Sequence, residues 1–185
     1  MKILCAGDSE SFKFAIPIGI GLVKSAINLT ELIIKKKPNS LLFIGSAGSY
    51  GNLEPFDIFH SKVSTNIETG YFLDNCYTPI NNKVISNIQN VSYETTNDKK
   101  MLVNSSNYIT TNKSISNKFL ENGIEAENME FYSILTVANK FNIPAYGIFI
   151  ITNYCDNQAH NDFIKNHKKA KAKLTLHVEK QVSKR

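Results

Sequence analysis

Apolar and polar positions along the chain follow two patterns, one typical of buried strands and one typical of amphipathic helices. Short apolar or alternating runs predict strands at 2–6, 12–18, 40–44, 57–64, 100–104 and 145–151. Apolar residues at helical spacing predict helices at 22–37, 113–122, 129–141 and about 158–182. The segment 65–98 is polar, rich in asparagine and without a clear period. This alternation predicts an α/β fold, a three-layer sandwich with helices packed on a mixed, twisted sheet.

The run at 145–151 is apolar on both faces, as expected of a central strand covered by helices on both sides. It leads directly into Thr152 and Asn153. Ligands in open α/β sheets bind beyond the carboxyl ends of such strands, so these two side chains are placed for chemistry rather than packing. A simple turn-forming role is the alternative for Asn153.

The helix predicted at 129–141 begins with Met129 and Glu130, and its neighbouring side chains are largely apolar. In one interpretation, the Glu130 carboxylate only stabilises the positive end of the helix dipole. In the other, it is held in a cleft and accepts hydrogen bonds from sugar hydroxyls.

Two glycine-rich segments are candidates for ligand contacts. At 45–48 a buried strand runs into Gly-Ser-Ala-Gly, small residues that let backbone N–H groups approach a ligand, although a tight turn is an equal alternative. At 19–21 the pattern Gly-Ile-Gly lacks the third glycine of a dinucleotide fingerprint, because that position is Lys24. Val23 stands where a P-loop requires glycine, so neither nucleotide motif is present.

Composition narrows the class of protein. The 185 residues are 42% hydrophobic, which predicts one globular domain over 1–185, and no apolar run approaches the roughly 20 residues of a membrane span. The net charge of +5 comes from lysines, several of them on the C-terminal helix, where a solvated face is favoured over a nucleic-acid site. Three cysteines form no paired framework, which favours a reducing cytoplasm. No His, Cys or Asp cluster has metal-ligand spacing, and no cofactor is expected.

Taken together, these segments resemble the purine nucleoside phosphorylase and nucleosidase superfamily, which includes methylthioadenosine/S-adenosylhomocysteine nucleosidases and futalosine hydrolases. Segment 19–26 resembles the family's GIGKVNAA, 45–48 matches its GSAG, 55–58 is similar to VGDI, 107–109 resembles QFI and 129–130 matches ME. The match spans nearly the whole chain in order and spacing. It implies the nucleoside phosphorylase-like fold, shortened at the N-terminus, and a homo-oligomer, because family sites commonly borrow residues from a neighbouring subunit.

Three features depart from the family pattern. The first strand connects almost directly to the strand before Gly19, where the family usually has a helix and a strand between them. The catalytic strand ends in Thr152-Asn153 instead of Ser-Asp, which resembles futalosine hydrolases and the trimeric phosphorylases that act on 6-oxopurines. The polar middle segment is too divergent to align.

The resemblance implies cleavage of the N-ribosidic bond of a purine nucleoside, with Asn153 and Glu10 as the catalytic residues. Asn153 would hydrogen-bond the purine, and Glu10 would activate water, unless the family's base aligns two residues later on Phe12. The implied substrate-binding residues are Ser46, Ala47, Gly48, Tyr108, Ile109, Met129 and Glu130. Among them, Tyr108 would stack on the base and Glu130 would hold the ribose hydroxyls.

Water is favoured over phosphate as the nucleophile. In the phosphorylases arginines hold the phosphate, whereas the only arginine here is Arg185. A purine nucleoside phosphorylase, a non-catalytic nucleoside-binding paralogue and a nucleic-acid-associated protein remain the alternatives.

Overall fold

A computed structural model describes residues 1–74, 76–87 and 101–183 of the chain. Its strands are β1 (Lys2–Cys5), β2 (Ile16–Pro17), β3 (Leu41–Ser49), β4 (Ile58–Ser61), β5 (Val63–Thr65), β6 (Lys83–Ile85), β7 (Leu102–Ser105), β8 (Ala126–Asn128) and β9 (Ala145–Tyr154). Its helices are α1 (Leu22–Lys36), α2 (Lys113–Glu121), α3 (Phe131–Lys140) and α4 (Ala159–Val182), with short 3-10 helices η1 (Asp8–Glu10) and η2 (Thr69–Leu73).

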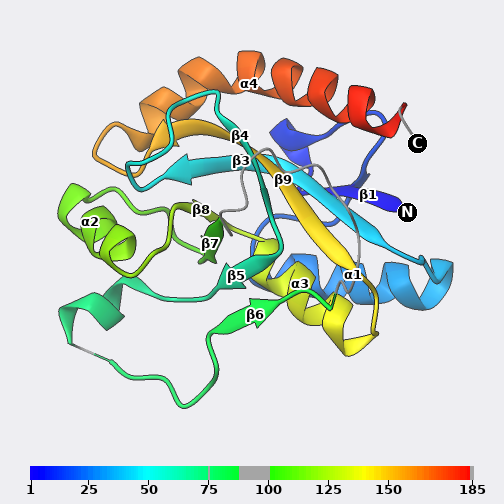
Figure 1. The fold of residues 1–185 in the computed structure, drawn as a ribbon, viewed down its shortest axis with the longest axis horizontal. Coiled ribbons are helices and arrows are strands. Elements are labelled where there is room, and N and C mark those ends of the chain that lie inside the picture. Colours follow the sequence, from blue (N-terminus) through cyan, green and yellow to red (C-terminus); the bar gives the residue numbers. More distant parts are fainter. Residues whose placement is uncertain (75, 88–100, 184–185) are drawn as a thin grey trace.

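The nine strands of the described residues join one mixed sheet, in the order β2-β1-β3-β8-β7-β5-β6, with β9 pairing both β3 and β4. Helix α4 covers one face, and α1 and α3 cover the other (Figure 1). The predicted α/β fold with helices packed on a mixed sheet is therefore confirmed.

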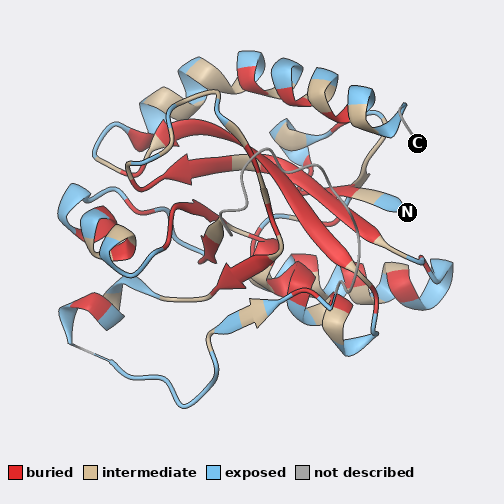
Figure 2. Cartoon of the chain, in the orientation of Figure 1, coloured by how far each residue is buried: buried red, intermediate tan, exposed pale blue. Residues whose placement is uncertain are grey.

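The core lies in two layers, one on each side of the sheet (Figure 2). The layer under α1 and α3 contains Leu29, Phe131 and Leu135, all fully buried. The layer under α4 is built around Leu174 and Ile148, which are also fully buried. Strand β9 is buried over almost its whole length, because it lies between the two layers as its apolar sequence predicts. No helix in the described part of the chain is long and apolar enough to cross a membrane.

Two predicted strands differ from the structure near their ends. Of 12–18, only Ile16–Pro17 pairs with β1, because the preceding residues turn, with the Ala15 N–H donating to the Phe12 carbonyl at 3.1 Å. Phe12 lies in the core under α4 instead. Of 100–104, the strand covers Leu102–Ser105, and residue 100 lies outside the described residues.

The segment predicted as one strand at 57–64 forms two. Strand β4 pairs with β9, whereas β5 pairs with β6 and β7. The Ser61 hydroxyl accepts the N–H of Val63 at 3.1 Å and donates to its carbonyl at 2.8 Å, which supports the break between the strands.

The small residues at 45–48 do not form a turn, because β3 continues through them to Ser49. Strand β9 pairs along β3 on one side, and β8 pairs with Gly48 and Ser49. The backbone at 45–49 thus pairs with two strands that lie far away in the sequence. Strand β9 also runs past 151 to Tyr154, so Thr152 and Asn153 lie within the strand, near its end.

Candidate functional site

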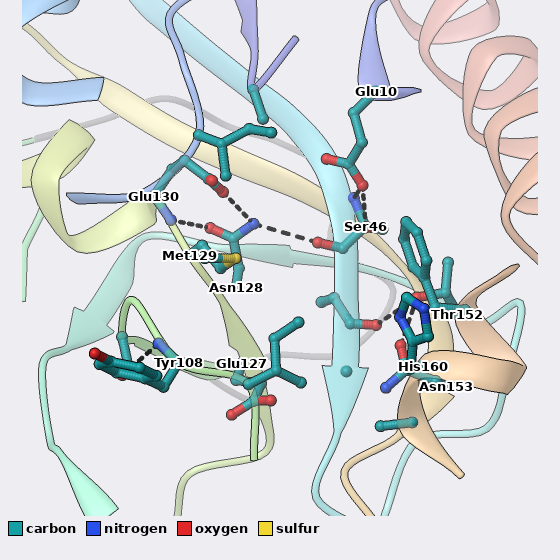
Figure 3. Close-up of a pocket in the computed structure, with 18 of the residues that line it drawn as sticks. Glu10, Ser46, Tyr108, Glu127, Asn128, Met129, Glu130, Thr152, Asn153 and His160 are labelled. Atoms are coloured by element: carbon teal, nitrogen blue, oxygen red, sulfur yellow. Dashed lines mark hydrogen bonds between the residues drawn. The ribbon is translucent and has the colours of Figure 1, made fainter. Parts of the chain in front are cut away.

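A cavity of about 420 Å³ opens where the carboxyl ends of β1, β3 and β9 meet β8 and the first turn of α4. Its volume lies in the range of about 300–1,000 Å³ that is usual for small-molecule sites. The residues for which the resemblance implied a catalytic or substrate-binding role all line it, apart from the alternative base Phe12: Glu10, Ser46, Ala47, Gly48, Tyr108, Ile109, Met129, Glu130 and Asn153. Figure 3 shows Glu10, Glu130 and Asn153 around this one space.

Glu130 immediately precedes α3 and is only 2% exposed. Its two carboxylate oxygens accept hydrogen bonds from the Gly21 N–H and from the Asn128 amide, both at 2.9 Å. The pKa of the Glu130 carboxyl is raised to about 7, because burial and the nearby Glu10 carboxylate raise it by more than the hydrogen bonds from Gly21 and Asn128 lower it. The carboxylate is thus fixed in direction and retains free lone pairs for a ligand.

Asn128 holds Glu130 in this position. Its Oδ1 accepts the backbone N–H groups of Glu130 and Phe131 at 2.8 and 2.9 Å, which caps the start of α3. Its Nδ2 donates to the Glu130 carboxylate and to the Ser46 carbonyl, so it links the helix start to β3 (Figure 3). An asparagine just before a helix is the local signal that could have indicated this role.

Glu10 lies at the end of η1 and faces the cavity across Ser46. Its Oε1 accepts the Ser46 N–H at 3.1 Å and also the Ser46 hydroxyl. Two side chains of α4 hold the turn from behind, since His167 Nε2 lies 2.9 Å and Lys171 Nζ 3.0 Å from the Ser9 carbonyl oxygen. Phe12, the alternative position for the base, packs in the core and does not line the cavity.

Asn153 is 6% exposed, and its amide is oriented by its neighbours in β9. The Thr152 hydroxyl donates to Oδ1 at 2.8 Å, and Nδ2 donates to the Tyr154 carbonyl at 2.9 Å. One N–H and one lone pair of the amide therefore remain for a ligand.

Gly48 forms the floor of the cavity next to Asn153. A Cβ at this position would lie 2.7 Å from Cys155 Sγ, 3.2 Å from Asn153 Nδ2 and 3.5 Å from Glu127 Cγ. There is no room for a side chain at this position. The Gly48 backbone is therefore left uncovered between the Asn153 and Glu127 side chains.

Glu127 is a second buried carboxylate in the cavity wall, although sequence reasoning gave it no role. Its oxygens accept the Thr110 N–H at 2.9 Å, the Thr110 hydroxyl at 2.7 Å and the Tyr50 hydroxyl at 2.9 Å. Burial raises its pKa, and these hydrogen bonds lower it. Its partners lie 17 and 77 residues away in the sequence, so no local pattern indicated them.

Tyr108 and Ile109 lie at the rim of the cavity and are 80% and 55% exposed. The adjacent Asn107 side chain accepts the Leu22 N–H at 3.0 Å, which ties this rim to the start of α1. The Tyr108 ring is thus available to contact a flat ligand from the open side.

A family model described as the phosphorylase superfamily matches residues 12–183. The chain belongs to the phosphorylase superfamily. No curated protein sequence matches it.

Solved structures of nucleosidases share the fold of this superfamily member. A Helicobacter pylori 5′-methylthioadenosine/S-adenosylhomocysteine nucleosidase mutant with 5′-methylthioadenosine in the active site has a TM-score of 0.80 at 16% identity, covering 100% of this chain and 98% of that chain. A Helicobacter pylori futalosine hydrolase mutant has a TM-score of 0.80 at 17% identity, with the same coverage. The Streptococcus pneumoniae nucleosidase with 8-aminoadenine has a TM-score of 0.73 at 15% identity, covering 95% of this chain and 96% of that chain.

Cationic groups are scarce in the cavity of this phosphorylase-superfamily chain. None of the described residues that line it is a lysine or arginine, and Arg185 lies outside the described residues. Within 1–74, 76–87 and 101–183, no three His, Cys, Asp or Glu side chains converge on a point that could hold a metal. Thr152, which the sequence placed for chemistry together with Asn153, also lines the cavity. The lining residues without a sequence-based role are Ala6, Ser9, Ile20, Ser106, Thr111, Glu127, Asn128, Ala159, His160 and Phe163.

Proposed function

We propose that the chain cleaves the N-ribosidic bond of a purine nucleoside with water as the nucleophile. The observation that carries the proposal is the convergence of Glu130, Glu10 and Asn153 on one cavity that lacks lysine and arginine among its described lining residues. The superfamily match and the nucleosides bound in similar structures support the same substrate class.

Glu130 would accept hydrogen bonds from the ribose 2′- and 3′-hydroxyls and stabilise the positive charge that develops at the sugar. Met129 would line the ribose pocket next to it, and the backbone at Ser46–Gly48 would approach the nucleoside closely. Glu10 would take a proton from the attacking water as its oxygen bonds to C1′. The electron pair of the C1′–N9 bond would leave with the purine.

Asn153 would act on the departing base. Its free N–H would donate to a carbonyl O6, and its oxygen would accept from a protonated N7. The amide cannot donate a proton as an acid does, so the N7 proton would come from solvent. Tyr108 and Ile109 would cover the base from the rim.

The first prediction concerns the nucleophile. Purine release from inosine, adenosine, methylthioadenosine or futalosine is expected at equal rates in phosphate-free and phosphate buffer, because the described cavity offers no cation to bind a phosphate dianion. The products would be free purine and ribose or its 5′-derivative, measured by chromatography. Strict phosphate dependence with ribose 1-phosphate as product would show a phosphorylase. No release from the panel, with binding by calorimetry, would show a non-catalytic paralogue.

The second prediction concerns the base. Asn153→Asp should shift preference from 6-oxopurine toward 6-aminopurine nucleosides by about tenfold or more, because an unpaired buried polar group costs about 1–3 kcal/mol. The ratio of kcat/KM for inosine to that for adenosine measures the shift. Asn157→Asp makes the same change at an exposed position and should leave the ratio as it is. An unchanged ratio in Asn153→Asp would contradict the proposed contact.

We also infer a homo-oligomer formed through α1. Three aliphatic side chains at helical spacing on this helix are strongly exposed: Val23 (65%), Ile27 (62%) and Ile34 (61%). Ile20 continues the stripe at 42% exposure and lines the cavity rim, as do Tyr108 and Ile109. A second copy on this face would shield the apolar stripe and the open side of the cavity.

The third prediction tests this interface. The wild-type chain should be a dimer or larger at micromolar concentration by light scattering, and Ile27→Asp should be a monomer because it buries a charge in the contact. Leu176→Asp is the matched control, since Leu176 is an exposed aliphatic residue on α4 (59%). A wild-type monomer, or the same dissociation in both variants, would contradict the α1 interface.

Two further proposals concern the location of the protein and its domain organisation. We infer a cytoplasmic location, because all three cysteines are free, with Cys5 and Cys155 buried as small apolar residues. We also infer that residues 1–185 act as one domain, since strands from both ends of the chain share one sheet. A nucleic-acid role for α4 is less favoured, because Lys171 and Lys173 donate to the backbone carbonyls of Ser9 and Phe56.

A further inference from the structure

One edge of the cavity is formed by a segment without regular secondary structure. Residues 106–112 connect Ser105, the last residue of β7, with Lys113, the first residue of α2. We call 106–112 the rim segment, because it carries Tyr108 and Ile109 on the open side of the cavity. A segment outside helices and strands has no backbone ladder to hold it, so its position depends on the groups that anchor it.

The first half of the rim segment has anchors of its own. The Ser106 hydroxyl donates to the Glu68 carboxylate at 2.9 Å and accepts the Tyr108 N–H at 3.2 Å. The Asn107 side chain accepts the Leu22 N–H at 3.0 Å. These hydrogen bonds tie the segment to η2 and α1, but only as far as Tyr108.

The second half of the rim segment is held by the carboxylate of Glu127. Thr110 donates to it twice, from its N–H to Oε1 at 2.9 Å and from its hydroxyl to Oε2 at 2.7 Å. Thr110 is buried and does not line the cavity, whereas its neighbours Ile109 and Thr111 do. Within the part of the chain that the structure describes, no other hydrogen bond joins 109–111 to the rest of the molecule.

Glu127 is in turn held by the sheet and by α2. It lies in β8, where it pairs with Gly48 of β3 and Asn104 of β7. Its Oε2 also accepts the Tyr50 hydroxyl at 2.9 Å, and the Tyr50 ring stacks on Phe119 of α2 with centroids 4.2 Å apart. All three groups donate to the carboxylate, and its ionised form can accept them at once. A buried strand thus presents a fixed acceptor to the rim segment.

We propose that Glu127 is a positioning residue that fixes Thr110 and so places Tyr108 and Ile109 over the bound base. The carboxylate takes no part in breaking the N-ribosidic bond. Its effect on substrate binding rests on the proposed function, whereas its hold on the rim segment does not. The proposal accounts for a buried carboxylate in the cavity wall that the proposed reaction leaves without a task.

Digestion with chymotrypsin measures the hold on the rim segment without any substrate. Cleavage after Tyr108 requires the segment to open locally, and Glu127→Gln and Thr110→Val should each speed it by at least about tenfold. Glutamine offers one oxygen where glutamate offers two, and valine lacks the donating hydroxyl. Mass spectrometry of the fragments identifies each cut and its rate.

Two controls accompany the digestion. Tyr50→Phe removes one hydrogen bond from the same carboxylate but leaves both bonds to Thr110, so cleavage after Tyr108 should stay at the wild-type rate. Cleavage after Tyr77, which is strongly exposed and lies outside the rim segment, is the internal reference and should be equal in all variants. Thermal melting checks that each variant is folded.

Steady-state purine release separates positioning from chemistry. In Glu127→Gln the KM for inosine should rise about tenfold while kcat stays within about threefold, because a contact made equally before and during the reaction is lost. Thr110→Val should show the same division between KM and kcat. In a Tyr108→Ala background, Glu127→Gln should add little to KM, since the ring that it places is no longer present.

The outcomes distinguish this proposal from the proposed function. Unchanged cleavage after Tyr108 in both folded variants would overturn the positioning role. A change in KM or kcat in Glu127→Gln that Thr110→Val does not share would also overturn it, and would show that the carboxylate contacts the nucleoside directly. A wild type that releases no purine, with the expected cleavage pattern in its variants, would contradict the proposed function and leave the hold of Glu127 on the rim segment established.

Discussion

Replacing Glu130 by glutamine is expected to lower kcat/KM for purine release by about a hundredfold to a thousandfold. The variant loses the negative charge proposed to face the sugar, and its new N–H₂ group faces the Asn128 amide, which donates to this position at 2.9 Å in the wild type. Glu125→Gln is the matched control, because Glu125 is also buried (6% exposed) but lies outside the cavity. Unimpaired purine release by a folded Glu130→Gln variant would contradict the proposed role.

The pKa of about 7 for Glu130 adds a test of the same role by pH. The proposed function needs the ionised carboxylate, which predominates above this pKa. For the free enzyme, kcat/KM should therefore fall as the pH drops below about 7, approaching tenfold per pH unit. This fall in kcat/KM at low pH should be absent from the residual activity of Glu130→Gln. A wild-type profile that stays flat down to pH 5 would show that the protonated form is equally competent.

Replacing Glu10 by glutamine should lower kcat by about a hundredfold or more, with little change in KM, because the carboxylate is proposed to act on water rather than on the nucleoside. Asp8→Asn is the control in the same turn. Asp8 is exposed and has a left-handed backbone (φ 48°), which asparagine also tolerates. Steady-state purine release measures both variants. A Glu10→Gln variant with wild-type kcat would place the base elsewhere.

The elements that could be predicted from the sequence are those whose own apolar residues show which face is buried. Strand β9 and helix α3 have continuous or helically spaced apolar residues, so their positions follow from local pattern. Strand β8 has only three residues, two of them polar, and it forms because β3 and β7 offer free edges on both sides. Such pairing is a property of the assembled sheet, which a local window cannot detect.

The candidate site divides in the same way. Glu130 was identifiable because a carboxylate among apolar residues is anomalous, and Gly48 because the small residues follow a buried strand. Glu127 could not be identified from the sequence. Its buried carboxylate accepts hydrogen bonds from Tyr50 and Thr110, and these residues come close to it only in the folded chain. The resemblance to a family supplied roles for residues, but the partners that orient them required the structure.

The contacts of α4 with the Ser9 carbonyl have a consequence for synthesis of the chain. The turn that carries Glu10 is synthesised well before α4, because His167 and Lys171, which contact the Ser9 carbonyl, follow it by 158 and 162 residues. A nascent chain without α4 already contains Glu130 and α3, but it lacks the two side chains that hold the Glu10 turn in place. The water activation proposed for Glu10 would thus require that α4 has been synthesised and has packed against this turn.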